Sequence, residues 1–148
     1  MDNLGVSDFK QALAKANGSV VGASDTSPLN TGAVKVSSRL LDFHLAAAEI
    51  ADLKSRLTRI RIVAYSVPTI SRDEAEARKL FEFTKSLNVS TIVVDEVPTS
   101  LAIVDRLASE FGVDVALSNQ GDPQEFANTL SNLGPRVGAF IDPSIWAE

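Results

Sequence analysis

Segments of helical and of strand periodicity alternate along most of this chain, from about residue 46 onward. Apolar and β-branched runs typical of buried strands occur at residues 60–67, 90–94, 113–117 and 136–141. Patterns typical of amphipathic helices precede them at residues 46–58, 71–87, 99–111 and 122–133. Because successive strands lie about one βα unit apart, the pattern predicts consecutive βα units on a parallel sheet. An α/β fold is therefore expected.

Local signals mark the ends of several predicted helices. Ser71 and Glu74 form a capping box at the start of one helix. Asp122 and Pro123 supply the N-cap and the first-turn proline of another. Gly112 is typical of the left-handed residue that ends a helix.

The first 45 residues are less regular. They predict a short helix at residues 8–16 and a short strand at 19–23. Residues 24–42 are rich in Ser, Thr, Asn and Gly. This composition favours a long strand-to-helix loop that lines a site, or equally a partly disordered segment.

The length of 148 residues suits one domain, over residues 1–148. A closed eight-stranded βα barrel needs about 200 to 250 residues, so a barrel of this class would be partial, with about five βα units. The last predicted strand, 136–141, would then leave an open sheet edge. Such an edge offers pairing with a second copy of the chain.

Charge and composition narrow the expected partners and location. The formal net charge is −5, so the chain lacks a basic footprint for nucleic acid or for an anionic membrane surface. There is no cysteine, which excludes disulfides and thiolate metal ligands. No leader pattern opens the chain, and no apolar run approaches the ~20 residues of a membrane span. A cytoplasmic protein without membrane or nucleic-acid partners is expected.

Polar clusters follow three of the predicted strands. Asp95 and Glu96 come after strand 90–94, Asn119 and Gln120 after strand 113–117, and Asp142 after the last strand. The carboxyl ends of parallel strands are where ligands bind in α/β folds. Acids and amides gathered there indicate a binding site rather than packing.

Several short segments carry a family resemblance. They are Lys35-Val36-Ser37, Glu49-Ile50-Ala51-Asp52-Leu53-Lys54, Asp73-Glu74-Ala75 leading into residues 78–83, Thr91-Ile92-Val93, and Gly138-Ala139-Phe140-Ile141-Asp142. Together they resemble the sugar phosphate isomerase/epimerase family, which has a xylose-isomerase-like TIM barrel. The resemblance runs from about residue 20 to residue 146 and implies a partial (β/α)8 barrel that ends before the family's last strands.

The resemblance also implies a chemistry. Such a protein isomerises or epimerises a small sugar by proton transfer, with Mn²⁺, Mg²⁺ or Zn²⁺ held by carboxylates and a histidine. A metal on the carbonyl and hydroxyl oxygens of the sugar stabilises enediolate-like charge, while a carboxylate moves the proton.

The family's site residues map onto this chain in part. The metal-binding glutamate falls on Asp95, with Glu96 beside it as an alternative catalytic acid, and another metal ligand falls on Asp142. A His-Asn-His strand end is replaced here, so that Asn119 and Gln120 are the implied sugar-hydroxyl contacts. Two acids without imidazole make a weak Mg²⁺ site and a poor Zn²⁺ or Mn²⁺ site.

Two aromatic residues complete the implied site. Trp146 matches a family position, and Tyr65, near a strand end, is within reach of the pocket. Packing is the alternative interpretation for both. His44, the single histidine, has no matching family ligand, and a surface or capping role is expected for it.

Structural interpretations stand beside the functional ones at the strand ends. Asp95 and Glu96 also suit the solvated start of a βα loop. Asn119 also suits a turn residue that bonds its own backbone, and Asp142 suits an N-cap before Pro143.

Two functions therefore follow from the sequence. The first is a sugar isomerase/epimerase-like protein of carbohydrate metabolism, impaired by its missing histidines. The second is a non-catalytic carbohydrate-binding or structural relative.

Overall fold

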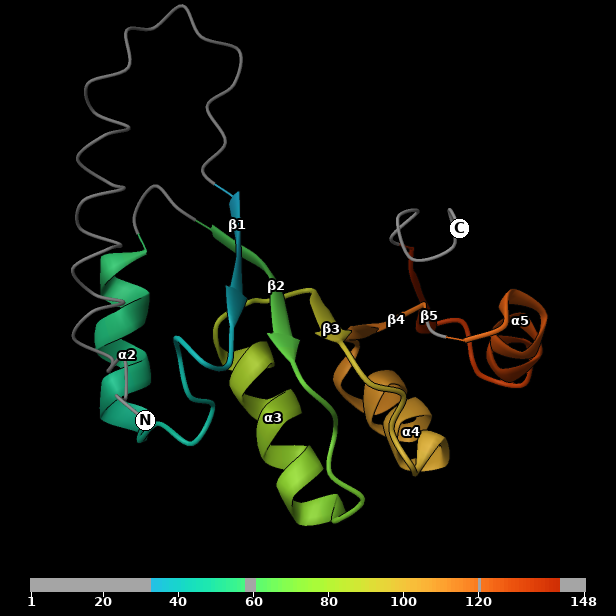
Figure 1. Ribbon diagram of the computed structural model, residues 1–148. Coiled ribbons are helices and arrows are strands. Elements are labelled where there is room, and N and C mark those ends of the chain that lie inside the picture. Colours follow the sequence, from blue (N-terminus) through green and yellow to red (C-terminus); the bar gives the residue numbers. More distant parts are fainter. Residues whose placement is uncertain (1–32, 58–60, 120, 142–148) are drawn as a thin grey trace, which may run out of the picture.

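Five parallel strands form one sheet in the computed structural model, which describes residues 33–57, 61–119 and 121–141. The strands lie side by side in chain order, and each connection between neighbours contains a helix (Figure 1). The elements are β1 (Ala33–Ser37), α2 (Ala47–Arg56), β2 (Arg61–Val67), α3 (Glu74–Ser86), β3 (Thr91–Val94), α4 (Leu101–Phe111), β4 (Asp114–Ser118), α5 (Pro123–Ser131) and β5 (Val137–Phe140). The predicted α/β fold of parallel βα repeats is confirmed.

Strand β1 corrects the sequence-based expectation, which placed residues 33–37 inside a loop. Val36 is buried and lies opposite Tyr65 of β2 in a parallel pair. The strand forms because this pairing buries Val36, an effect of the tertiary structure that local composition does not report. The helix predicted at 8–16 and the strand at 19–23 lie outside the described residues.

The N-terminus of α3 is a second correction, because the capping residue is Asp73 rather than Ser71. The Asp73 carboxylate accepts hydrogen bonds from the backbone N–H groups of Ala75 (2.8 Å) and Glu76 (3.3 Å). The Ser71 hydroxyl oxygen accepts instead from the Asp73 N–H at 3.1 Å. A carboxylate outcompetes a hydroxyl here because its charge also complements the helix dipole.

Two other helix ends are as predicted. Gly112 follows α4 in the left-handed conformation, with φ of 65°, a region that costs other residues energy. Asp122 caps α5 by accepting from the N–H groups of Gln124 (2.9 Å) and Glu125 (3.0 Å), with Pro123 as the first helical residue. None of the described helices is long and apolar enough to cross a membrane.

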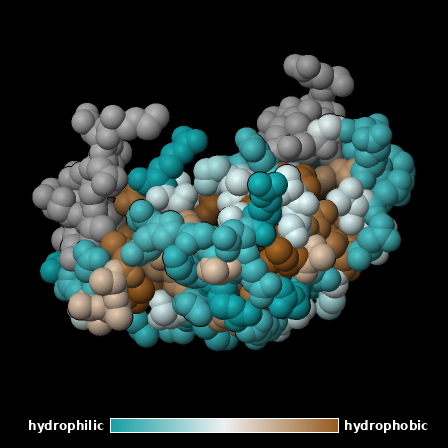
Figure 2. Space-filling view, turned by 90° about the horizontal axis from the view of Figure 1, so that it is seen from below, coloured by the Kyte–Doolittle hydropathy of each residue, from teal (hydrophilic) through white to brown (hydrophobic). Residues whose placement is uncertain are grey.

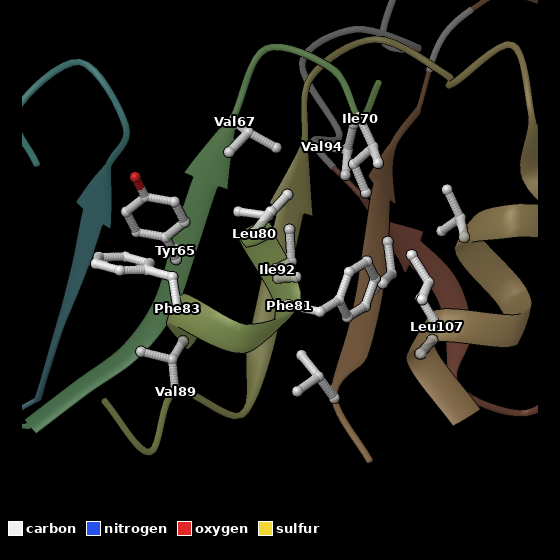
Figure 3. Close-up of a cluster of buried hydrophobic side chains, with 14 of the residues drawn as sticks. Tyr65, Val67, Ile70, Leu80, Phe81, Phe83, Val89, Ile92, Val94 and Leu107 are labelled. Atoms are coloured by element: carbon white, nitrogen blue, oxygen red, sulfur yellow. The ribbon is translucent and has the colours of Figure 1, made fainter. Parts of the chain in front are cut away.

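The main core lies between the sheet and its helices. Side chains of β2 and β3, such as Tyr65 and Ile92, point toward Leu80 and Phe83 of α3, with Leu107 of α4 beside them (Figure 3). All five are at most 2% exposed. Fully burying an aliphatic or aromatic side chain contributes about 1.5–3 kcal/mol, so this layer is the main source of stability.

The opposite side of the sheet is concave, and we call it the hollow face. Strand alternation and register assign to it Lys35, Ser37, Ala64, Ser66, Thr91, Val93, Ala116, Ser118, Gly138 and Phe140. The Lys35 ammonium of β1 lies 5.2 Å from the Phe140 ring centroid of β5. In a flat sheet these strands would be about 19 Å apart, so the contact requires a strongly curved sheet. Viewed from below, the molecule is a crescent hollowed on one side (Figure 2).

Candidate functional site

The carboxyl ends of β3 and β4 bring two of the predicted polar clusters to one edge of the sheet. Val94 is the register partner of Leu117, so the residues that follow them, Asp95 and Ser118, lie on neighbouring strands at the same level. Asn119 comes one residue later. Gln120 and Asp142 lie outside the described residues. The edge where parallel sheets bind ligands therefore carries an acid and a hydroxyl side by side.

Asp95 continues strand β3, whereas Glu96 begins the turn. The Asp95 N–H donates to the Val67 carbonyl at 3.1 Å, which extends the ladder between β3 and β2. Because Val94 points to the helices (Figure 3), alternation turns Asp95 toward the hollow face. The Glu96 N–H donates to the Pro68 carbonyl at 2.8 Å, so the alternating pattern stops there. Both side chains are exposed.

Hydroxyl groups from three strands line the hollow face near Asp95. Ser37 of β1 pairs with Ser66 of β2 in the register, and Ser118 of β4 has the same orientation. Ser66 is buried and the other two are half-buried. Hydroxyls both donate and accept, so these serines offer the hydrogen-bonding groups that a polyhydroxylated ligand requires.

Asn119 and Tyr65, two predicted sugar contacts, lie away from open surface. Asn119 is fully buried, and its N–H donates to the Phe140 carbonyl at 3.2 Å. Tyr65 is also fully buried, with its ring 5.1 Å from that of Phe83 and its hydroxyl donating to the Leu41 carbonyl. Burial raises the pKa of the Tyr65 phenol. Packing, the alternative interpretation for Tyr65, matches its position on the helix side of the sheet.

The predicted metal site falls only partly within the described residues. Asp95 lies on the hollow face, whereas Asp142, its predicted co-ligand, and Trp146 lie outside the described residues. Within residues 33–57, 61–119 and 121–141, no three acid or imidazole groups converge as metal ligands do. Asp95 offers the oxygen ligands that Mg²⁺ prefers.

Two residues of the hollow face were not predicted from the sequence. Lys35 is exposed, and Phe140 is 42% exposed although it is a large apolar residue. Their contact places a cation and an aromatic ring on the same face as Asp95. The alternation of side chains along residues 33–37 and 137–140 would have indicated the face on which Lys35 and Phe140 lie. Only the curvature of the sheet brings these two residues together.

His44 lies at the molecular surface, as the sequence suggested, and about half of its side chain is exposed. It belongs to the segment between β1 and α2, residues 38–46, and is part of a charged cluster outside the hollow face. Its backbone N–H donates to the Asp42 carboxylate at 2.9 Å.

Comparison with known proteins identifies the fold. No protein-family model and no curated protein matches the chain. A xylose isomerase domain protein from Planctomyces limnophilus matches in structure with a TM-score of 0.59 and 14% identity, over 76% of this chain and 55% of that one. An uncharacterized protein from Parabacteroides distasonis matches with a TM-score of 0.54 and 21% identity, over 66% of this chain and 42% of that one.

This likeness shows the fold alone. The chain spans about half the length of these two proteins and has the architecture of part of a xylose-isomerase-like TIM barrel. The predicted xylose-isomerase-like fold is thus confirmed, and membership of the sugar phosphate isomerase/epimerase family stays a prediction.

Proposed function

We propose that this chain is a sugar isomerase/epimerase-like protein that binds a small carbohydrate on its hollow face. One observation carries the proposal: Asp95 stands beside Ser118 at the carboxyl edge of a xylose-isomerase-like sheet, on the face that also bears Ser66. A carboxylate and hydroxyls at this edge match the hydrogen-bonding pattern of a sugar.

Each group has a role in this proposal. The Asp95 carboxylate accepts hydrogen bonds from adjacent sugar hydroxyls, or takes a proton from one carbon and returns it to the next. Glu96 is the alternative acid, and Gln120 contacts a remaining hydroxyl, whereas the buried Asn119 supports this strand end from below the surface. A divalent metal, when bound by Asp95 and Asp142, would supply charge stabilisation at the sugar oxygens.

The matched pair Asp95→Asn and Glu96→Gln tests this function. Both variants remove one exposed carboxylate, but only the first changes the side chain that continues the strand onto the hollow face. We expect Mg²⁺ or Mn²⁺ titration calorimetry with a ketose present to show binding heat for wild type and Glu96→Gln, and much weaker heat for Asp95→Asn. Sugar conversion should follow the same order.

The absence of binding heat with every metal and ketose, together with no sugar conversion, would exclude the isomerase function. Equal effects of the two substitutions would exclude the special role of Asp95.

A non-catalytic carbohydrate-binding protein is the second candidate, favoured by the exposed ring of Phe140. An aromatic face suits the apolar C–H face of a sugar and needs no metal. In this case sugar raises the melting temperature by ligand linkage, and a chelator does not change the effect. Phe140→Ala should abolish the shift, whereas Ile141→Ala, a neighbouring exposed residue, should preserve it.

A further inference from the structure

The single histidine of the chain lies between two carboxylates from different parts of the fold. The His44 Nδ1 is 2.7 Å from the Asp42 Oδ1, and its Nε2 is 3.0 Å from the Glu76 Oε2. Asp42 belongs to segment 38–46, and Glu76 to the first turn of α3. A neutral imidazole has one N–H and can donate to only one of these acceptors. The arrangement is therefore complementary to the protonated ring.

The two carboxylates that bond the ring favour that protonated form, and other ionisable groups lie on the adjoining elements. On α3, Lys79 forms an ion pair with Glu76, and Glu82 lines the same surface cavity as His44. On α2, Glu49 accepts from the Ala46 N–H at 3.1 Å. On β2, Tyr65 is neutral and its hydroxyl is bonded to the Leu41 carbonyl. Negative groups outnumber Lys79 in this region, so a proton on His44 offsets part of their charge.

His44 also contacts Phe43, which lines two cavities. The two rings lie 4.1 Å apart, centroid to centroid, with an interplanar angle of 31°. Phe43 lines a cavity of about 440 Å³ together with Leu45, Ile50 and Phe83. It also lines a second cavity of about 350 Å³, whose walls include Ile70, Ala77 and Leu80.

Apolar and polar contacts together hold this segment, in which Phe43 and Leu45 are half-buried and pack against the core. Leu41 is fully buried and its carbonyl accepts the Tyr65 hydroxyl, whereas His44 is exposed and contacts α3 through its ring. The imidazole contacts are thus a polar link between residues 42–46 and α3, beside the packing of Phe43.

We propose that protonated His44 is a clip that holds Phe43 between the two cavities, and that loss of its proton releases Phe43 and joins the cavities into one apolar groove. This device is independent of the carbohydrate function, because it lies on the helix side of the sheet.

The pH range of the clip follows from three ionisable groups. The hydrogen bonds to Glu76 and then to Asp42 raise the pKa of His44 above 6.5. Burial raises the pKa of Asp42, but hydrogen bonds from His44 outweigh it and leave that pKa below 3.8. Lys79 first, and His44 second, lower the pKa of Glu76 below 4.5.

The directions of these pKa shifts fix how the contribution of each group to stability changes with pH. The contribution of His44 is complete below pH 6.5 and is lost as the pH rises through its folded pKa. The contributions of Asp42 and Glu76 are present above pH 4.5 and are lost as the pH falls through their folded pKa values. The clip should hold most firmly between about pH 4.5 and 6.5 and should open in more alkaline solution.

The test begins with NMR titration of the single histidine in the full chain. We expect the pKa of His44 to exceed 6.5 in wild type and to fall toward 6.5 in Glu76→Gln. Lys79→Gln is the matched control, because it also breaks the pair between residues 76 and 79 but keeps the contact with His44. In that variant the pKa should stay above 6.5.

The release of Phe43 is measured separately. The NMR signals of Phe43 should shift with the same midpoint as His44, and fluorescence of a neutral hydrophobic dye should rise across that range. His44→Gln should bind the dye at pH 5.5 as strongly as wild type does at pH 8.5. Circular dichroism confirms that each variant is folded. A wild-type His44 pKa at or below 6.5, or dye binding that is independent of pH and of His44, would overturn the proposal.

Discussion

Substitution of Tyr65 by phenylalanine separates its two predicted roles, in packing and in sugar binding. The change removes only the hydroxyl, which donates to the Leu41 carbonyl in the fully buried core. The ring and its contact with Phe83 at 5.1 Å are retained. Any loss of stability therefore reports the hydrogen bond rather than a cavity.

The expected loss can be worked from this environment. An average hydrogen bond contributes about 0.5–1.5 kcal/mol, and a buried partner left unsatisfied costs about 1–3 kcal/mol. We expect Tyr65→Phe to lower the free energy of unfolding by about 1–2 kcal/mol. For a domain of this size, each kcal/mol lowers the melting temperature by about 2–4 °C.

Urea denaturation monitored by circular dichroism measures this loss, with Ser55→Ala as the control. The Ser55 hydroxyl also donates to a carbonyl, that of Asp52, but at an exposed position, so its loss should cost much less. Sugar binding by Tyr65→Phe should equal that of wild type. Unchanged stability combined with weakened sugar binding would refute the packing role and support a substrate-binding one.

Three further predictions address the helix cap, the hollow face and the open sheet edge. Asp73→Ala should lower the free energy of unfolding by about 1 kcal/mol, and Ser71→Ala should lower it by clearly less, because Asp73 is the cap. Urea denaturation measures both losses, and the reverse order would contradict the assignment of Asp73 as the cap. Gly138→Leu should leave stability nearly unchanged, since a Cβ atom there meets nothing within 4 Å, but should block sugar binding if the ligand occupies the hollow face. If copies of the chain pair through β5, the mass measured by size exclusion should rise with protein concentration. The substitutions Phe140→Ser and Ile141→Ser, at two exposed apolar residues, should reduce that rise. A constant monomer mass would exclude such pairing.

The regular part of the fold was predictable because several local signals agree there. Between α3 and β5, hydrophobic periodicity, the Gly112 helix end and the Asp122 cap all specify the same elements. Strand β1 was missed because its short run is surrounded by polar and small residues and becomes a strand through pairing with β2. The cap at Asp73 was missed because Ser71 satisfies the same sequence pattern.

The candidate site was predictable only where it depends on strand ends. Asp95 follows a strand whose limits the sequence indicates well, so its place at the carboxyl edge could be anticipated. The contact between Lys35 and Phe140 could not, because it joins the two outermost strands and depends on curvature. The His44 clip was equally hidden, since Asp42 and Glu76 converge only when segment 38–46 packs against α3.

The side chains of the hollow face themselves favour a ligand-binding surface over a packed barrel interior. Closed barrels of this class fill their interior with layers of large branched residues. Here one row across the sheet runs Ser37, Ser66, Val93, Ala116 and Gly138, in which Val93 is the single bulky branched side chain. Small side chains leave depth beneath Asp95 and Phe140, and the crescent in Figure 2 is hollowed on this side. A face built this way leaves room for the proposed carbohydrate, whereas a row of leucines would have filled that room.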